Sequence, residues 1–250
     1  MMISKNKIKL IRSLDLKKNR KERGVFVAEG PKVVEDLMEI FTPVTLVYRR
    51  PWQPPSQIQT TIELIEVSEE EMHKVSFLQH PQEVLGIFPI APLDASIPFP
   101  QQELSIALDG VQDPGNLGTI IRVADWFGIR NIYCSEDTAD VYNPKVVQAT
   151  MGSIARVNVT YTDLRNLIGQ LPADYPVYGT LLDGKDIYVE PLTSFGLIIM
   201  GNEGNGISPE IRKKVNRRLR INNFPPGRKT ADSLNVAIAT AITCSEFRRR

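Results

Sequence analysis

Apolar and polar positions along the first ninety residues switch between strand and helix spacing. Strands are predicted where β-branched and aromatic residues cluster, at 24–30, 44–50, 62–67 and 84–90. Residues 5–19 are a basic amphipathic segment, and Pro31 stands where the first residue of a helix is expected. Ser68 followed three residues later by Glu71 is the signature of a capped helix. The pattern predicts a small α/β domain.

In the rest of the chain, strand and helix patterns alternate. The predicted strands are 104–110, 131–136, 156–162, 176–182, 195–201 and 218–222, and the predicted helices are 116–128, 144–152, 163–171, 208–215 and 233–247. Apolar strands separated by helices are typical of an α/β fold with a parallel sheet covered on both faces. The segment 89–102 holds four of the 18 prolines and has no periodicity. It is predicted to link two domains, 1–95 and 103–250.

The composition is that of a globular protein, with 42% of the 250 residues hydrophobic and 24% charged. This balance excludes a disordered or fibrous chain, and no apolar run approaches the roughly 18 residues that cross a bilayer. The N-terminal segment lacks the apolar core of a secretory signal. Cys134 and Cys244 have no metal-ligand spacing and lie in apolar stretches, so they are predicted to be buried thiols. We therefore expect a cytoplasmic protein with no membrane partner.

The net charge of +1 conceals two basic segments on an acidic body. Residues 1–23 carry nine basic and two acidic side chains, and residues 211–230 carry eight basic side chains and no acid. The intervening residues 24–210 hold 25 acidic and ten basic side chains. Clustered cations favour a polyanion because neutralised phosphates release counterions. A solvated helix face and a solubilising patch are the alternative interpretation.

Three predicted strands end in turns whose residues suit ligand binding. Parallel sheets place ligands at the carboxyl ends of their strands, so the three turns are expected to converge on one site. The first turn leads to Asn116, which is predicted to cap a helix, and to Arg122, a planar cation suited to phosphate. The alternative is an ordinary strand-to-helix turn with a surface arginine. Neither His73 nor His80 lies near these turns, so both are interpreted as structural or surface residues.

The second turn joins four large apolar residues to Gly201, Gly204 and Gly206, with Glu203 among them. Glycines let a backbone approach a ligand closely, and the missing GK[ST] excludes a phosphate-binding P-loop. A flat adenine or a ribose therefore fits better than a triphosphate. Glu203 as a plain surface turn residue is the alternative.

The third turn runs through a Pro-Pro-Gly sequence to an alanine-rich helix. Ser233 is predicted to cap that helix, whereas capping does not account for Asn235. Together the order N-x-G-x-x-x-R, G-x-E-G-x-G and S-L-N-V resembles the SpoU (TrmH-like) family of RNA ribose 2′-O-methyltransferases in the SPOUT superfamily. The resemblance covers roughly 104–250. The segment before residue 90 is similar to an L30e-like RNA-binding domain that often precedes it.

This resemblance implies an α/β fold whose C-terminal segment forms a deep trefoil knot, a homodimer, and S-adenosylmethionine bound in the knot. The active-site positions of the family correspond to Asn116, Arg122, Glu203, Ser233 and Asn235. The cofactor contacts correspond to Thr180, Gly201, Ile221 and Leu234. Contacts with RNA are expected from Arg12, Lys17, Lys18, Arg20, Lys21 and Arg23, and from Arg228 and Lys229.

The implied reaction needs no metal. A ribose hydroxyl must be aligned with a sulfonium methyl group while charge builds on oxygen, which calls for positioning and electrostatics. Within the family the counterpart of Arg122 is thought to assist deprotonation. Since arginine stays protonated, with a pKa above about 12, positioning and charge stabilisation are the firmer role. Asn116, Ser233 and Asn235 would orient the ribose and Arg122.

The chain departs from the family pattern in two places. The link between the last strand and S-L-N is lengthened by NNFPPGRKTAD, and Ala237 stands where the family often has serine. Ribosomal RNA is the favoured substrate, and transfer RNA is the alternative. A non-catalytic RNA-binding protein is a further alternative, although Asn116, Arg122 and Glu203 are all present. An NAD-dependent enzyme is disfavoured because the G-x-G-x-x-G fingerprint is missing.

Overall fold

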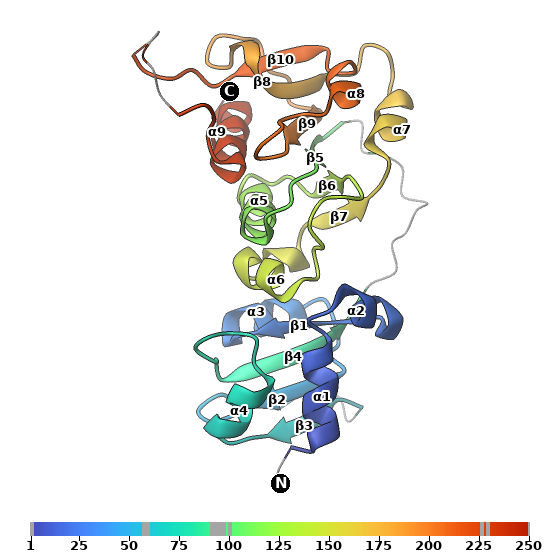
Figure 1. Ribbon diagram of the computed structural model, residues 1–250, viewed down its shortest axis with the longest axis vertical. Helices are drawn as coiled ribbons and strands as arrows, with labels where there is room; N and C mark the ends of the chain where they lie inside the picture. Colours follow the sequence, from blue (N-terminus) through green and yellow to red (C-terminus); the bar gives the residue numbers. More distant parts are fainter. Residues whose placement is uncertain are drawn as a thin grey trace. The chain divides into compact units, whose positions relative to one another are not determined.

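A computed structural model describes residues 3–56, 61–90, 99, 102–225, 228 and 231–249, so most of the predicted link 89–102 lies outside the described residues. The chain divides into two compact units (Figure 1). The N-terminal unit combines Met1–Leu93 with Asp140–Ala155, and the C-terminal unit combines Asp94–Ala139 with Arg156–Arg250. The structure thus differs from the predicted division at 1–95 and 103–250 by moving one internal segment to the N-terminal unit.

The N-terminal unit is built on a four-stranded sheet in the order β1-β4-β2-β3. Its strands are β1 (Val25–Glu29), β2 (Thr45–Tyr48), β3 (Glu63–Glu66) and β4 (Val84–Pro89), so all four predicted strands are confirmed. β4 pairs antiparallel with β1 and with β2, whereas β2 and β3 are parallel. The helices are α1 (Lys5–Ser13), α2 (Lys17–Arg23), α3 (Pro31–Met38) and α4 (Glu69–Val75), and α4 carries the predicted capping box.

The amphipathic segment 5–19 is divided between two separate helices, α1 and α2. The carbonyls of Leu14 and Asp15 accept hydrogen bonds from Nη1 of Arg20 at 2.7 and 2.6 Å. Those carbonyls would serve as intrahelical acceptors if α1 continued. The Arg20 side chain therefore stabilises the turn between α1 and α2. The spacing of apolar residues does not reveal this contact.

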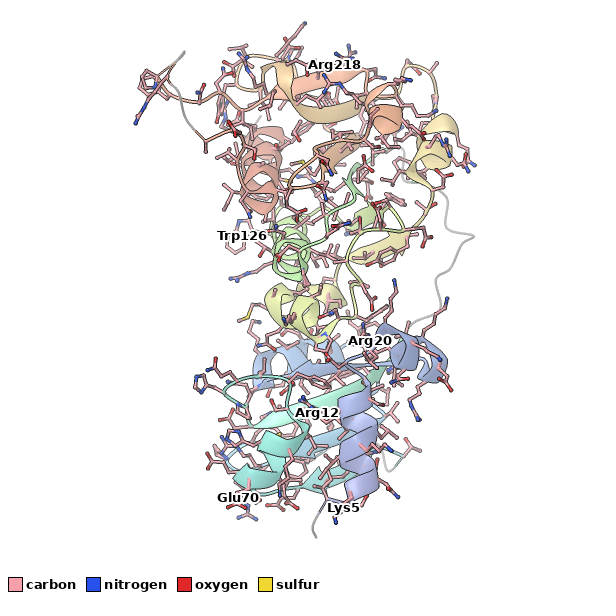
Figure 2. The ribbon with its side chains drawn as sticks, viewed as in Figure 1. Lys5, Arg12, Arg20, Glu70, Trp126 and Arg218 are labelled. Atoms are coloured by element: carbon pink, nitrogen blue, oxygen red, sulfur yellow. The ribbon has the colours of Figure 1, made fainter. Side chains whose placement is uncertain are left out.

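Arg20, which is labelled in Figure 2, is buried, with 2% of its surface exposed. Its Nη2 forms an ion pair with Asp140. The prediction that Arg20 contacts RNA is therefore wrong, since its guanidinium is enclosed by carbonyls and a carboxylate. Lys17, Lys18, Lys21 and Arg23 are exposed on the same helix. One face of α2 is buried, so Arg20 has a structural role while the other four cations remain on the surface. The sequence alone does not distinguish them.

Two apolar clusters cover the faces of this sheet. Val27 and Ile11 belong to the cluster that includes α1 and α4, whereas Phe26 belongs to the cluster that includes α3. Val147 of α6 (Pro144–Thr150) is buried in this second cluster, and Tyr142 contacts Phe26 with ring centroids 4.8 Å apart. These contacts are the physical reason why 140–155 folds with the N-terminal unit.

The C-terminal unit is built on a six-stranded sheet in the order β10-β8-β9-β5-β6-β7, in which every neighbouring pair is parallel. The strands are β5 (Leu104–Asp109), β6 (Asn131–Cys134), β7 (Asn158–Tyr161), β8 (Val177–Asp186), β9 (Gly196–Gly201) and β10 (Arg217–Arg220). All six predicted strands are present, and the predicted α/β fold with a parallel sheet is confirmed.

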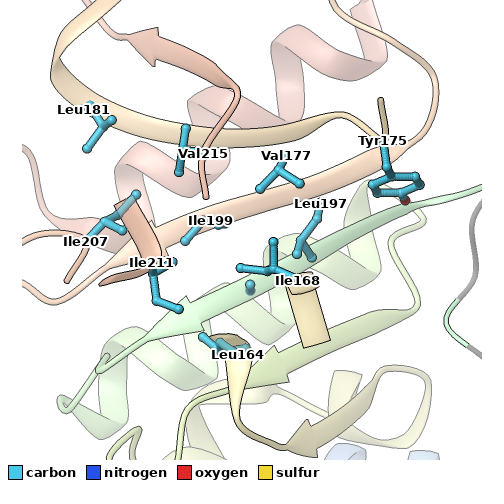
Figure 3. Packing of buried hydrophobic residues seen from close by; sticks show 11 residues of the cluster. Leu164, Ile168, Tyr175, Val177, Leu181, Leu197, Ile199, Ile207, Ile211 and Val215 are labelled. Carbon is cyan, nitrogen blue, oxygen red and sulfur yellow. The ribbon is translucent and has the colours of Figure 1, made fainter. Parts of the chain in front are cut away.

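Helices cover both faces of the large sheet (Figure 1). On one side, α7 (Leu164–Gly169) and α8 (Pro209–Arg212) supply Leu164, Ile168 and Ile211 to a core with Val177 and Ile199 (Figure 3). On the other side, α5 (Pro114–Trp126) packs against α9 (Val236–Arg249). A short 3₁₀ helix, η1 (Ser153–Ala155), follows α6 in the N-terminal unit.

Both cysteines are buried, as predicted. Burial raises the pKa of the Cys244 thiol to about 12 and also raises the pKa of Cys134, because a thiolate loses its hydration there. The longest helix of the described chain is α9 with 14 residues, and none of the described helices could span a bilayer.

Candidate active site

The turns after β5 and β9 are joined at the carboxyl edge of the large sheet. The Asp109 carboxylate accepts a hydrogen bond from the Ser208 amide at 2.7 Å, and the Asn202 side-chain amide donates to the Gly110 carbonyl at 2.7 Å. β5 and β9 are neighbours whose registers align Asp109 with Gly201. The parallel pairing therefore brings together two turns that lie about ninety residues apart in the sequence.

Side chains from all three predicted motifs form one continuous chain of hydrogen bonds. The Glu203 carboxylate accepts from Nδ2 of Asn116 at 2.9 Å, and Oδ1 of Asn116 accepts from Nδ2 of Asn235 at 2.9 Å. Oδ1 of Asn235 in turn accepts from the amides of Ala237 and Ile238 at 3.0 and 3.2 Å. The predicted convergence of the three motifs is confirmed.

The direction of each hydrogen bond in this series follows from the groups at its two ends, the Glu203 carboxylate and the backbone amides of α9. An ionised carboxylate only accepts, so Asn116 must present its amide nitrogen to Glu203 and its oxygen to Asn235. Asn235 must then turn its own oxygen toward the free amides at the start of α9. Glu203 also accepts from the amides of Gln112 and Asp113, both at 3.4 Å, so its carboxylate is engaged on the first motif.

Two predicted helix caps are wrong. α5 is capped by Asp113, whose carboxylate accepts from the Asn116 amide at 2.8 Å, because Pro114 occupies the first helical position. α9 is capped by Asn235 and not by Ser233, since the helix begins only at Val236. Asn116 and Asn235 are therefore placed so that their side chains face each other across the site.

The turn after β9 depends on Asn202, which sequence reasoning missed. Asn202 and Gly206 exchange two backbone hydrogen bonds, of 3.0 and 2.9 Å. Oδ1 of Asn202 accepts from the amides of Gly204 and Asn205. A Cβ atom on Gly201 would lie 2.2 Å from the carbonyl carbon of Gly206, so this position requires glycine. An asparagine that directly follows a strand was the available signal, since this residue type often bonds to the backbone two residues on.

A pocket of about 380 Å³ lies beside this turn. It is lined by all four residues predicted to contact a cofactor, Thr180, Gly201, Ile221 and Leu234, and also by Glu203 and Ser233. Leu181, Leu182, Met200 and Ile207 add apolar surface, and the backbone of 201–206 supplies polar groups. Such a lining suits a flat heteroaromatic ring that is held by main-chain hydrogen bonds.

The outer wall of the pocket is a deviation within β8. The pairing of β8 with β10 passes from Gly179 opposite Arg218 directly to Lys185 opposite Leu219, so 180–184 leaves the ladder. Asp183 in this excursion accepts from Nη2 of Arg212 at 2.5 Å and from Nη1 of Arg218 at 3.3 Å. Sequence reasoning missed Asp183, because nothing in its local pattern indicates distant arginine partners.

Arg122, Asn116 and Asn235 do not line the pocket. Arg122 lies exposed on α5 and makes no hydrogen bond or ion pair with any other described residue. Within the described ranges, no group of three or more His, Cys, Asp or Glu side chains is placed to hold a metal ion. Lys229 falls outside the described residues, and Arg228 is exposed.

Arg12 is exposed on α1, but its guanidinium is already engaged. It lies 4.8 Å from the ring centroid of Phe77 and donates to the carbonyl of Ser76. Ser76 and the Phe77 amide in turn donate to the Glu29 carboxylate, whose pKa is raised because burial outweighs these hydrogen bonds. Arg12 therefore supports the fold of the N-terminal unit.

Comparison with known proteins identifies the family. The chain matches the SpoU rRNA Methylase family over residues 103–245 and the MRM3-like substrate binding domain over residues 5–86. The 23S rRNA (guanosine(2553)-2′-O)-methyltransferase RlmP of Bacillus subtilis is 31% identical over 250 residues, which are 97% of this chain and 96% of that protein.

Solved structures agree with this match. A TrmH-family protein from Porphyromonas gingivalis is 40% identical, with a TM-score of 0.86 and 100% of both chains covered. An AdoMet-bound rRNA methyltransferase from Sinorhizobium meliloti is 34% identical, with a TM-score of 0.85 over 100% of this chain and 97% of that one. The match over more than half of the chain shows that this protein belongs to the SpoU rRNA methylase family.

Proposed function

We propose that this methyltransferase uses S-adenosylmethionine to methylate a ribose 2′-hydroxyl of ribosomal RNA. The observation that carries the proposal is the hydrogen-bond chain Glu203–Asn116–Asn235, which joins three motifs beside the pocket. The names of the relatives support ribosomal RNA over transfer RNA, and RlmP of Bacillus subtilis is named for 2′-O-methylation of 23S rRNA.

The pocket fits S-adenosylmethionine. Its apolar walls suit an adenine ring, and its glycine turn leaves main-chain groups accessible where a Cβ atom on Gly201 could not fit. The structure of the Sinorhizobium meliloti relative is described as AdoMet-bound. When bound, S-adenosylmethionine supplies an electrophilic methyl group. Thr180, Gly201, Ile221 and Leu234 would hold it in this pocket.

The residues of the chain divide into two roles. The Glu203 carboxylate is engaged by Asn116 and two backbone amides, so it acts as a positioning residue for the first motif. Asn116 and Asn235 hold each other and fix the start of α9. Arg122 has no partner among the described residues, which leaves its guanidinium available to stabilise charge on the ribose oxygen. Ser233 lines the pocket and would orient the ribose.

Calorimetric titration with S-adenosylmethionine tests the proposal. We expect saturable binding by the natural protein and a loss of at least about tenfold in affinity for Gly201→Ala, because its Cβ atom would push the turn away from β9. Gly169→Ala is the control, since Gly169 does not line the pocket and its Cβ atom would meet only Nζ of Lys214 at 3.5 Å. Absence of heat at high ligand concentration would leave only the non-catalytic alternative.

The exposed cations of α2 are proposed to bind RNA phosphates. Reversing Lys17, Lys18 and Lys21 to glutamate should weaken RNA binding and lower the slope of log affinity against log salt by about one for each phosphate that α2 no longer neutralises. Lys74→Glu on α4 is the control for a charge change on the same unit. An unchanged salt slope in the triple variant would make this segment merely solubilising.

The resemblance also implies a homodimer. Trp126 on α5 and Ile238 on α9 are 84% and 52% exposed, and Figure 2 shows Trp126 projecting from its helix. We propose that these helices meet a second copy of the chain, which sedimentation at two protein concentrations would decide. The trefoil knot and the cytoplasmic location stay predictions.

A further inference from the structure

The lengthened link of the third motif emerges at the mouth of the pocket. Ile221, at its start, and Asp232 and Ser233, at its end, all line the pocket. The side chain of Asn223 donates to the Arg228 carbonyl at 3.1 Å, and the Arg228 amide donates to the Pro225 carbonyl at 3.2 Å. These two hydrogen bonds tie Arg228 to Asn223 and Pro225, which lie in the described part of the link.

Phe224, which lies between Asn223 and Pro225 in this link, has 84% of its surface exposed. By contrast, Ile221 just before the link and Leu234 just after it both line the pocket. No aromatic contact involves Phe224 within the described chain. Packing within this unit therefore does not explain an aromatic ring at position 224. A binding partner with a flat surface that stacks on the ring would explain it.

The charge around Phe224 indicates the nature of that partner. No acidic residue lies between Glu210 and Asp232 in the sequence. Arg220, which lines the pocket, and Arg228 are both exposed and lie four residues before and after Phe224. This segment thus combines an exposed ring with two exposed arginines. Surfaces that bind single-stranded nucleic acid use the same combination, in which bases stack on the ring and cations contact phosphates.

We propose that Phe224 stacks on an unpaired base of the RNA substrate next to the methylated nucleotide, with Arg220 and Arg228 contacting the flanking phosphates. The inference rests on the proposed function and adds how the substrate is recognised. A 2′-hydroxyl that must reach a pocket in the protein is presented most readily by nucleotides outside a duplex, whose bases are free to stack. Phe224 is thus a substrate-binding residue that does not touch the reacting atoms.

The test compares Phe224→Ala, Phe224→Leu and Phe224→Trp in the full chain. With unmethylated 23S ribosomal RNA transcribed in vitro as the probe, Phe224→Ala should raise KM for RNA roughly 10-fold, which corresponds to the loss of about 1.4 kcal/mol of stacking. Phe224→Leu should behave like Phe224→Ala, because it keeps apolar surface without a ring. Phe224→Trp should restore KM. The rate at saturating RNA and the affinity for S-adenosylmethionine should stay unchanged in all three.

Tyr188→Ala is the matched control, since Tyr188 is also an exposed aromatic residue of this unit, 44% exposed, and does not line the pocket. An unchanged KM in Phe224→Ala would overturn the proposal. A shift in oligomeric mass in Phe224→Ala would overturn it in favour of a contact with a second copy of the chain. If the natural protein binds the RNA without methylating it, the proposed function fails. The stacking proposal can then still be tested, because a base stacked on the tryptophan of Phe224→Trp should quench its fluorescence when RNA is added.

Discussion

Arg122→Ala is expected to slow methyl transfer by about 100-fold or more at saturating substrates, since removal of one group that stabilises developing charge costs that much in other enzymes. Affinity for S-adenosylmethionine should stay nearly unchanged, because Arg122 does not line the pocket. Stability should also stay unchanged, because the exposed side chain makes no hydrogen bond or ion pair with other described residues. Single-turnover methylation of RNA, with calorimetry on the same samples, measures all three.

Arg122→Lys separates charge from shape. It retains the positive charge but loses the planar fork of donors, so it should recover only part of the rate. Arg130→Ala is the control, since Arg130 is another exposed arginine of the same unit. Full methylation by Arg122→Ala would remove this residue from the mechanism.

Arg20→Ala is expected to destabilise the N-terminal unit by about 3 kcal/mol, because it leaves Asp140 and two carbonyls without their donor. Such a loss lowers Tm by roughly 10 °C in a chain of this size. Lys21→Ala, an exposed position on the same helix, should change stability by less than about 0.5 kcal/mol. Urea unfolding followed by circular dichroism measures both.

A double-mutant cycle isolates the ion pair. Arg20→Met with Asp140→Leu should recover much of the stability lost in either single variant, because no buried charge is left unpaired. Equal and additive losses would show that the two side chains contribute independently. They would then locate the effect of Arg20 in its hydrogen bonds to Leu14 and Asp15.

The sequence predicts the structure correctly wherever the local conformational preference of a segment agrees with its tertiary packing. All ten strands were predicted, since β-branched runs mark buried strands, and Pro31 does open α3. The three motifs were predicted to converge because parallel strands share a carboxyl edge, and the bonds among Glu203, Asn116 and Asn235 confirm it.

The misses are long-range contacts. Arg20 looked like its basic neighbours, because a charge count carries no information on burial. Its two carbonyl partners ended α1 early, although the apolar spacing continues past them. Asp183 accepts a hydrogen bond from Arg212, which lines the pocket but lies 29 residues away in the sequence. Asn202 binds the Gly110 carbonyl from a turn whose geometry the sequence does not specify.

The placement of Asp140–Ala155 has a consequence for how the protein is made. Neither unit is a continuous stretch of chain, since this segment lies inside 103–245 yet completes the apolar cluster around Phe26. During synthesis this cluster can be completed only after residues 140–155 have left the ribosome. Cleavage near residue 95 would accordingly release a fragment deprived of Tyr142 and Val147, prone to aggregate through the surface that these residues normally shield.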